Sequence, residues 1–173
     1  MRTSSWLLIF PLILSACGGE STQPLSAIPV TPLPPSALPF QVLEASIAST
    51  QAALQSKQLS CVQLVDLYLS RIAQFDTATA AGLPINSVLR LAPNAGAEAA
   101  TLDVLQASGG WAGPLHCVPI LLKDNYDTHD FPTTAASRSL AGMLPADDAF
   151  TVKRLRAAGA IVLGKTTMSE FAY

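Results

Sequence analysis

The stretch DDAFTVKRLRAAGAIVLGKTT, residues 147–167, decides the fold class of this chain. We expect Asp147 or Asp148 to cap a helix, because apolar side chains then recur at helical spacing. Gly159 is typical of the residue that follows the end of a helix, and the apolar run AIVL after it predicts a buried strand. With the earlier apolar run VPILL at 118–122, the order is strand, helix, strand. This order predicts an α/β protein with a parallel pair of strands.

The same stretch satisfies a phosphate-binding pattern, G-x-x-x-x-G-K-[ST], from Gly159 to Thr166. In a phosphate loop a strand precedes the first glycine, and the four variable residues present exposed N–H groups to the phosphates. Here a helix precedes Gly159, and the variable residues 160–163 are themselves the predicted strand. Nucleotide binding is therefore kept only as a minor alternative, and Lys165 is expected on the surface or in a loop.

The first 16 residues have the features of an export signal. A positive charge at Arg2 precedes the apolar run WLLIFPLIL at 6–14, which is too short to span a bilayer comfortably. The next residues, LSAC, end at Cys17 and resemble the lipobox of bacterial lipoproteins, in which the cysteine thiol receives lipid. We expect residues 1–16 to be a lipoprotein signal peptide and lipidated Cys17 to hold an exported protein on a membrane, at its periplasmic or extracellular face. An ordinary secretory peptide with an incidental cysteine stays open.

A proline-rich segment, residues 17–40, separates the lipobox from the rest of the chain. It contains six of the 13 prolines, which favours extended polyproline II and predicts a tether. The formal net charge is only −2, so nothing points to nucleic acid as a partner. The hydrophobic content of 50% suits a globular core, and residues 41–173 are expected to fold.

Other elements are predicted upstream of the strand–helix–strand unit. Helices are expected over 42–54, 60–75 and 94–107, and a short strand over 85–91. Ser60 and Gln63 form a capping-box pattern at the start of the second helix. Cys61 and Cys117 fit either a disulfide in an oxidising compartment or two buried free thiols. No C-x-x-C or Cys/His spacing suggests a metal site.

Polar residues with chemical potential follow the strand at 118–122. Lys123 stands directly after it, and ligands of parallel α/β sheets bind outside the carboxyl ends of the strands. The ordinary alternative is a lysine that reaches solvent from the end of a strand. Burial against the preceding apolar residues would favour the neutral amine. Asp124 should point away from Lys123 and make structural hydrogen bonds, and His116 is expected to be packed and hydrogen-bonded.

Three ordered blocks resemble the amidase signature family. Residues 113–124, GPLHCVPILLKD, resemble its G-P-L-H-G-[VI]-P-[IV]-x-x-K-D block, and DFPTTAAS at 130–137 resembles P-T-T-A-G-S. Residues 147–173 resemble D-A-x-x-V-x-x-L-x-x-A-G-A-x-x-x-G-K-x-N-M-x-E-F-A. The resemblance implies that residues 41–173 are the N-terminal part of a truncated amidase domain. The implied fold is a three-layer α/β/α arrangement with a mixed central sheet, incomplete in this chain.

The resemblance also implies a reaction, the hydrolysis of a carboxamide C–N bond without metal or cofactor. The family uses a nucleophilic Ser, a second Ser with a cis peptide bond, and a Lys that acts as base through the second Ser. Lys123 matches this lysine, and Asp124, Thr134 and Ser137 are expected to support the site. The Gly/Ser-rich segment with both serines follows the third block in the family, so these 173 residues are expected to be inactive alone. The expected partners are a small-molecule amide and, through lipid at Cys17, a membrane.

Three residues depart from the family's blocks. Cys117 and Ala136 stand where the family has Gly, and Thr167 stands where it usually has Asn. If those glycines adopt positive φ, a side chain at either position is unfavourable. A non-catalytic lipid-anchored binding protein, or a degenerate remnant on an amidase scaffold, therefore stays as an alternative. The family's cytoplasmic amidotransferase member, which acts on charged tRNA, is disfavoured because it needs no export signal.

Overall fold

A computed structural model describes residues 40–77, 82 and 84–173. The predicted signal peptide, the lipidation site Cys17 and nearly all of the predicted tether lie outside the described residues. No helix in the described ranges is long and apolar enough to cross a membrane.

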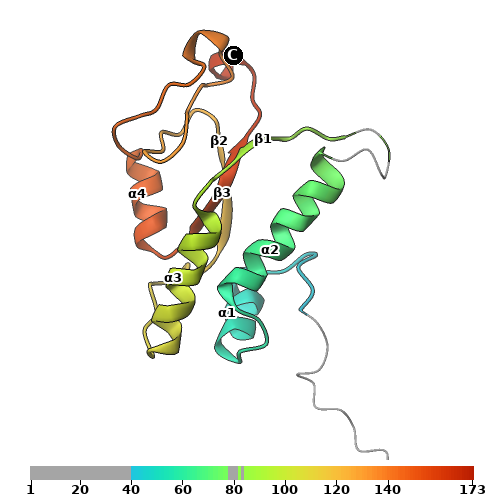
Figure 1. The fold of residues 1–173 in the computed structure, drawn as a ribbon, viewed down its shortest axis with the longest axis vertical. Coiled ribbons are helices and arrows are strands. Elements are labelled where there is room, and N and C mark those ends of the chain that lie inside the picture. Colours follow the sequence, from blue (N-terminus) through green and yellow to red (C-terminus); the bar gives the residue numbers. More distant parts are fainter. Residues whose placement is uncertain (1–39, 78–81, 83) are drawn as a thin grey trace, which may run out of the picture. The chain divides into compact units, whose positions relative to one another are not determined.

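A three-stranded mixed sheet lies at the centre of the fold (Figure 1). Its order is β1 (Val88–Leu91), β3 (Ile161–Thr166), β2 (Pro119–Lys123). β2 runs parallel to β3, and β1 runs antiparallel to β3. α4 (Phe150–Ala157) connects β2 to β3, so the predicted strand–helix–strand unit is confirmed. β3 is buried over its first five residues, as expected for a strand covered on both faces.

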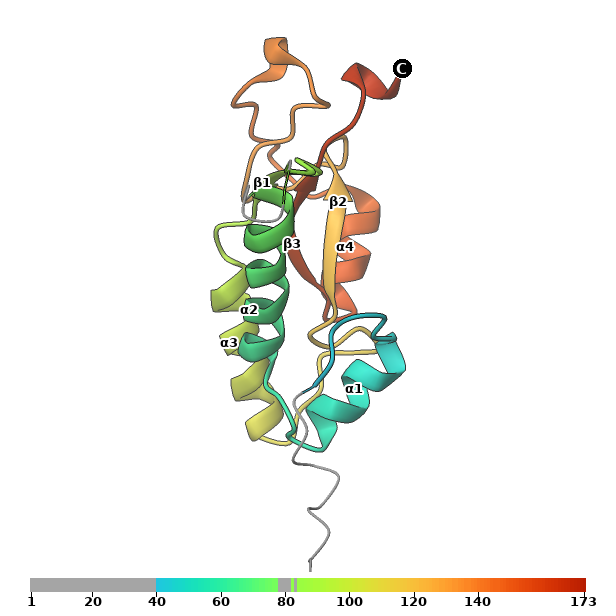
Figure 2. The ribbon, with the colours of Figure 1, turned by 90° about the vertical axis from the view of Figure 1, so that its right-hand side faces the viewer.

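Helices lie on both sides of this sheet, with α2 (Cys61–Arg71) and α3 (Ala95–Ala107) opposite α4 (Figure 2). One buried cluster joins α1 (Ile47–Gln55), α2 and α3 to Ile161 and Leu163 of β3. A second cluster joins α4 to Leu122 and Val162, on the other side of the sheet. The helix–sheet–helix layering expected from the resemblance is therefore present. A π-helical turn, Ile72–Thr77, continues α2, and short 3-10 turns occur at Arg138–Leu140 and Glu170–Ala172.

The start of α2 is fixed by polar side chains. Ser60 Oγ accepts a hydrogen bond from the Gln63 backbone N–H, and the Gln63 side chain accepts from the Ser60 N–H, so the predicted capping box is confirmed. Asp103 of α3 also accepts from the backbone N–H groups of Cys61 and Val62, at 2.7 and 3.1 Å. A carboxylate at the positive end of the helix dipole stabilises both the helix end and its contact with α3.

Two helix starts differ from the sequence prediction. α1 begins at Ile47 rather than 42, because Ser46 caps it by accepting from the Ser49 N–H at 3.0 Å. Neither Asp147 nor Asp148 caps α4, whose first residue follows Ala149 without a side-chain cap. The physical reason is competition, because the Asp148 carboxylate accepts hydrogen bonds from His129 instead.

Gly159 and Gly164 are required by packing. Gly159 follows α4 with a φ of 94°, as predicted, and a Cβ there would lie 2.8 Å from the His116 Cα. Gly164 lies inside β3, where a Cβ would collide with the Arg90 carbonyl of β1. The two glycines of the phosphate-loop pattern therefore allow close backbone contacts on either side of a buried strand. The nucleotide interpretation is wrong for this geometry, because 161–163 lie in β3 between two paired strands.

Cys61 and Cys117 form a disulfide, which decides between the two alternatives that the sequence left open. Their Cα atoms are 5.4 Å apart, and both residues are fully buried. The bond ties the first residue of α2 to the segment that enters β2. It therefore holds the strand that carries Lys123 against the helical layer.

Candidate active site

Lys123 is the last residue of β2, at the carboxyl ends of the parallel strands β2 and β3. Its ammonium donates a hydrogen bond to the Thr167 carbonyl at 2.7 Å. The side chain is exposed, so the expected burial against the preceding residues is wrong for this chain. The reason is that β2 is an edge strand of the described sheet, where Leu121 is also exposed and Leu122 packs toward α4. Lys123 is thus an accessible amine at the edge where α/β sheets bind ligands.

Asp124 points into the fold, and its predicted structural role is confirmed. It is fully buried, and its Oδ2 accepts hydrogen bonds from the backbone N–H groups of Thr134 and Ala136, both at 3.2 Å. The Thr134 hydroxyl donates to the same oxygen. The Ala135 N–H donates to the Asp124 carbonyl at 2.9 Å. Asp124 therefore holds the segment 134–136 beside the end of β2.

Ser137 fixes the other end of that segment. It is buried, and its hydroxyl donates to Glu170 Oε1 at 2.6 Å and lies 2.7 Å from Ser139 Oγ. The Phe171 N–H also donates to the Ala135 carbonyl at 2.9 Å. Ser137 thus connects this segment to the turn at Glu170–Ala172. The structure places Thr134 and Ser137 in contact with neighbours of Lys123, not with Lys123 itself.

The positions that depart from the family's glycines have the backbone that favours glycine. Cys117 has a φ of 60° and Ala136 a φ of 56°, both in the left-handed region. The expected positive φ is therefore confirmed at both, and each side chain carries a conformational penalty. Thr167 donates to the Ser87 carbonyl through its N–H at 2.8 Å and through its hydroxyl at 3.3 Å. Its side chain therefore helps to fix the carbonyl that accepts from Lys123.

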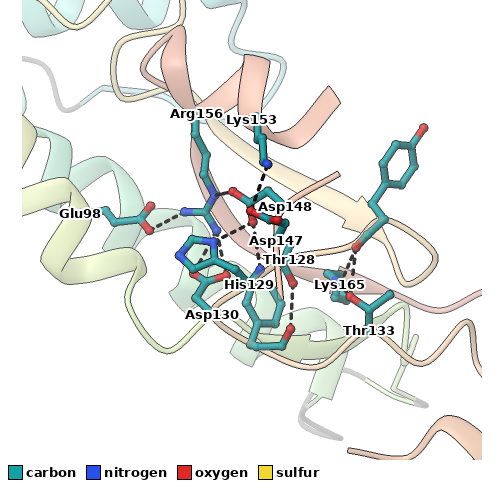
Figure 3. Close-up of polar contacts among 12 residues, drawn as sticks. Glu98, Thr128, His129, Asp130, Thr133, Asp147, Asp148, Lys153, Arg156 and Lys165 are labelled. Carbon is teal, nitrogen blue, oxygen red and sulfur yellow. Dashed lines mark hydrogen bonds and ion pairs between the residues drawn. The ribbon is translucent and has the colours of Figure 1, made fainter. Parts of the chain in front are cut away.

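Lys165 is the residue that the sequence interpretation placed wrongly, because it is fully buried rather than on the surface. Its ammonium donates to the Tyr126 carbonyl at 2.8 Å and to the Thr133 hydroxyl at 2.7 Å (Figure 3). It also lies 5.0 Å from the centre of the Phe131 ring. Burial lowers the pKa of Lys165, and the charge of Asp124 opposes this shift. The sequence signal was its place in an uninterrupted buried strand.

Lys165 acts on the turn that follows Lys123. The Tyr126 N–H donates to the Lys123 carbonyl at 3.0 Å, and the carbonyl of the same Tyr126 accepts from Lys165. The buried ammonium therefore fixes the turn from within the fold. Asp124 fixes its first residues from the side of segment 134–136.

A charge network around Arg156 connects three elements (Figure 3). Arg156 of α4 pairs with Glu98 of α3 at 2.6 Å, with Asp130 at 2.9 Å and with Asp148 at 3.2 Å. Burial disfavours the guanidinium charge, but the carboxylates of Glu98 and Asp130 outweigh this and raise the pKa of Arg156. The network holds the loop after β2 against both helical layers.

Two groups of possible metal ligands occur in the described residues, and neither fits a metal. In the first, the sulfurs of Cys61 and Cys117 are joined, and His116 Nδ1 accepts a hydrogen bond from the Ala112 N–H at 3.1 Å. A neutral ring that accepts at Nδ1 carries its proton on Nε2, so Nε2 has no lone pair for a metal. In the second, His129, Asp130 and Asp148, both carboxylates already pair with Arg156.

His116 has the packed, hydrogen-bonded role that the sequence predicts. It is fully buried and stacks on Trp111 with ring centres 4.0 Å apart. Burial lowers the pKa of His116, and the charge of Asp103 opposes this shift. The imidazole is therefore neutral and stabilises the segment that leads into β2.

Comparison with known proteins supports the architecture and the motif blocks. A family model described as Amidase matches residues 63–173. The glutamyl-tRNA(Gln) amidotransferase protein of Thermobifida fusca that matches this chain is 40% identical to it over 133 residues, which are 76% of this chain and 26% of that protein. The chain thus spans about a quarter of the length of this relative.

Solved structures give the same result. Native peptide amidase from Stenotrophomonas maltophilia superposes with a TM-score of 0.68 and 43% identity, over 74% of this chain and 26% of that one. An amidase family protein from Bacillus anthracis superposes with a TM-score of 0.69 and 35% identity, over 75% of this chain and 25% of that one. Because the family model covers well over half of the sequence and these folds agree, the chain belongs to the amidase signature family.

Proposed function

We propose that this chain contributes to an amidase that hydrolyses the C–N bond of a small carboxamide. The observation that carries the proposal is the placement of Lys123. The residue that matches the family's lysine ends β2, reaches the carboxyl edge of the sheet, and presents its amine 2.7 Å from the Thr167 carbonyl. Family membership supplies the reaction class, and this lysine supplies a base in the expected place.

In the proposed mechanism, Lys123 acts through a bridging Ser whose peptide bond is cis. Neutral Lys123 accepts the proton of the bridging Ser, which in turn accepts the proton of the nucleophilic Ser. The nucleophile attacks the amide carbonyl, and the relay returns the proton to the leaving nitrogen. Water then hydrolyses the acyl-enzyme. Both serines are expected from the Gly/Ser-rich segment that follows the third block in the family, so residues 1–173 alone are expected to be inactive.

The surroundings of Lys123 support a positioned base. Its neighbour Asp124 is fixed by three donors from 134–136, and the turn after it is fixed by Lys165. A rigid backbone on both sides limits where the amine can go, and correct placement of a catalytic group supplies much of the rate enhancement in enzymes. Cover over the exposed face of β2 would also favour the neutral amine by desolvation.

The test is replacement of Lys123 by Met in the full-length protein. Release of ammonia from simple primary amides should fall at least about 100-fold, the usual size of a lost general base. Lys153→Met is the matched control, because Lys153 is an exposed lysine on α4 that pairs with Asp147. Amide hydrolysis that survives in Lys123→Met would sink the proposal.

A second candidate function is non-catalytic binding on the amidase scaffold. The observation in its favour is that Cys117 and Ala136 occupy left-handed positions where the family has Gly. An amidase requires measurable turnover by the full-length protein, whereas a binding protein would retain amide ligands unchanged. Ammonia release against a panel of amides therefore separates the two functions.

We also propose that the protein is exported and anchored to a membrane by lipid on Cys17, with residues 17–40 as the tether. Support comes from the Cys61–Cys117 disulfide, since such bonds persist in oxidising compartments. Wild-type protein should incorporate a labelled fatty acid and sediment with membranes, and Cys17→Ala should do neither. Equal labelling of both proteins would contradict lipidation at Cys17.

A further inference from the structure

A cavity of about 280 Å³ opens beside the proposed catalytic lysine. It is bounded by the end of β1, the segment 134–142 and the residues that follow β3. Thr167 lines it, and the carbonyl of the same Thr167 accepts the hydrogen bond from Lys123. A group held in this cavity would therefore lie next to the reacting end of a substrate.

Two arginines give the cavity its charge. Arg90 reaches it from β1, and Arg138 from the 3-10 turn above it. No Asp or Glu is among the residues that line it. Within the described ranges, neither guanidinium forms an ion pair.

Arg90 also has an unsatisfied donor. Its side chain is half-buried, and its Nε is enclosed without any hydrogen-bond partner among the described residues. Enclosed donors in folded proteins nearly always have an acceptor, and each exception needs an explanation. A ligand oxygen in the cavity would satisfy this donor.

The hydroxyl groups around the cavity are already used as donors. Thr134 donates to Asp124, Ser137 donates to Glu170, and Thr167 donates to Ser87. The two guanidiniums are the charged groups left to select a ligand. A guanidinium binds a planar carboxylate through two parallel hydrogen bonds, whereas a neutral amide offers it less.

We propose that this cavity binds a carboxylate of the substrate through Arg90 and Arg138. The substrate class is then an amide that carries an anionic group, such as the mono-amide of a short dicarboxylic acid. This inference rests on the proposed amidase function, because it assigns the specificity of the same site.

The test compares two amides of similar length in the full-length protein, succinamate and butyramide. Succinamate replaces the terminal methyl group of butyramide with a carboxylate. Wild-type kcat/KM should be at least tenfold higher for succinamate. Arg90→Met and Arg138→Gln should each reduce this ratio at least fivefold, mainly through a higher KM for succinamate.

Arg154→Gln is the matched control. Arg154 is an exposed arginine on α4 that lies over the Phe150 ring, away from the residues that line the cavity. The substrate ratio should be the same in this variant as in wild type. Because Arg138 is exposed, its replacement tests the cavity even if Arg90→Met folds poorly.

The outcomes separate the inference from the proposed function. If wild type hydrolyses butyramide as well as succinamate, or if both arginine variants keep the wild-type ratio, the carboxylate site is wrong while the amidase function stands. If wild type hydrolyses neither amide, calorimetry with succinate decides the cavity. Binding that weakens at least fivefold in Arg138→Gln supports it, and no binding to wild type overturns it.

Discussion

Replacing Cys117 by Gly should separate two opposite effects of one residue. Cys117 forms a disulfide with Cys61 across 56 positions of sequence, and its φ of 60° is the backbone that the family fills with Gly. Cys117→Gly removes the disulfide and relieves the backbone. Cys117→Ala removes the disulfide and keeps the strained backbone, and Cys61→Ala does the same with the native residue left at 117.

The magnitudes follow from chain entropy and backbone sterics. Closing a loop of this length removes about 14 cal/mol/K from the unfolded chain, which stabilises the fold by about 4 kcal/mol at 25 °C. A left-handed non-glycine residue costs about 1–2 kcal/mol. Glycine loses about 0.5–1 kcal/mol more backbone entropy on folding, so the net relief is about 0.5–1 kcal/mol. Cys61→Ala and Cys117→Ala should thus lose about 4 kcal/mol, and Cys117→Gly about 3–3.5 kcal/mol.

Urea unfolding of the full-length protein, with and without dithiothreitol, measures these differences. Reductant should bring wild type close to Cys61→Ala and should leave all three variants unchanged. If Cys117→Gly is no more stable than Cys117→Ala, the backbone argument is wrong. If wild type ignores reductant although its thiols become free, the entropy argument is wrong.

Three other predictions concern buried polar groups. Burial lowers the pKa of His116, so the unfolded chain binds the proton first and stability should fall as the pH drops below the ordinary value of 6.5; His116→Phe should flatten this slope in urea titrations. Burial also lowers the pKa of Lys165, so the stability of wild type relative to Lys165→Met should rise as the pH increases toward 10.5, and a constant difference would contradict this. Asp124→Asn should lose about 1–3 kcal/mol, and a double-mutant cycle with Thr134→Val should show coupling of at least about 0.5 kcal/mol, whereas additive losses would mean that the two side chains do not act together.

Local patterns predicted many of the elements correctly. The spacing of apolar residues located α2, α4 and the buried part of β3, and Ser60 with Gln63 marked the first turn of α2. Gly159 marked the end of α4. These features depend on residues that are close in sequence, so the sequence contains the whole interaction.

Side-chain positions that depend on distant partners were predicted less well. Lys165 appeared to be a surface residue because lysines usually are, but its acceptors at Tyr126 and Thr133 lie far away in sequence. The pairing of β2 with β3 also shifts between Ile120 and Leu121, so simple alternation does not give the side of the sheet. Asp148 had the chemistry of a helix cap, but His129 uses its carboxylate.

The sequence by itself determined the family, the strand–helix–strand unit and the position of Lys123 after β2, because motif blocks and hydrophobic periodicity are local. Tertiary structure alone decided that Cys61 reaches Cys117, that Lys165 rather than Lys123 is buried, and that Arg90 meets Arg138 at one cavity. Each of these facts depends on which segments pack together. Packing fixes solvation, and solvation sets the charge and the available partners of every buried polar group.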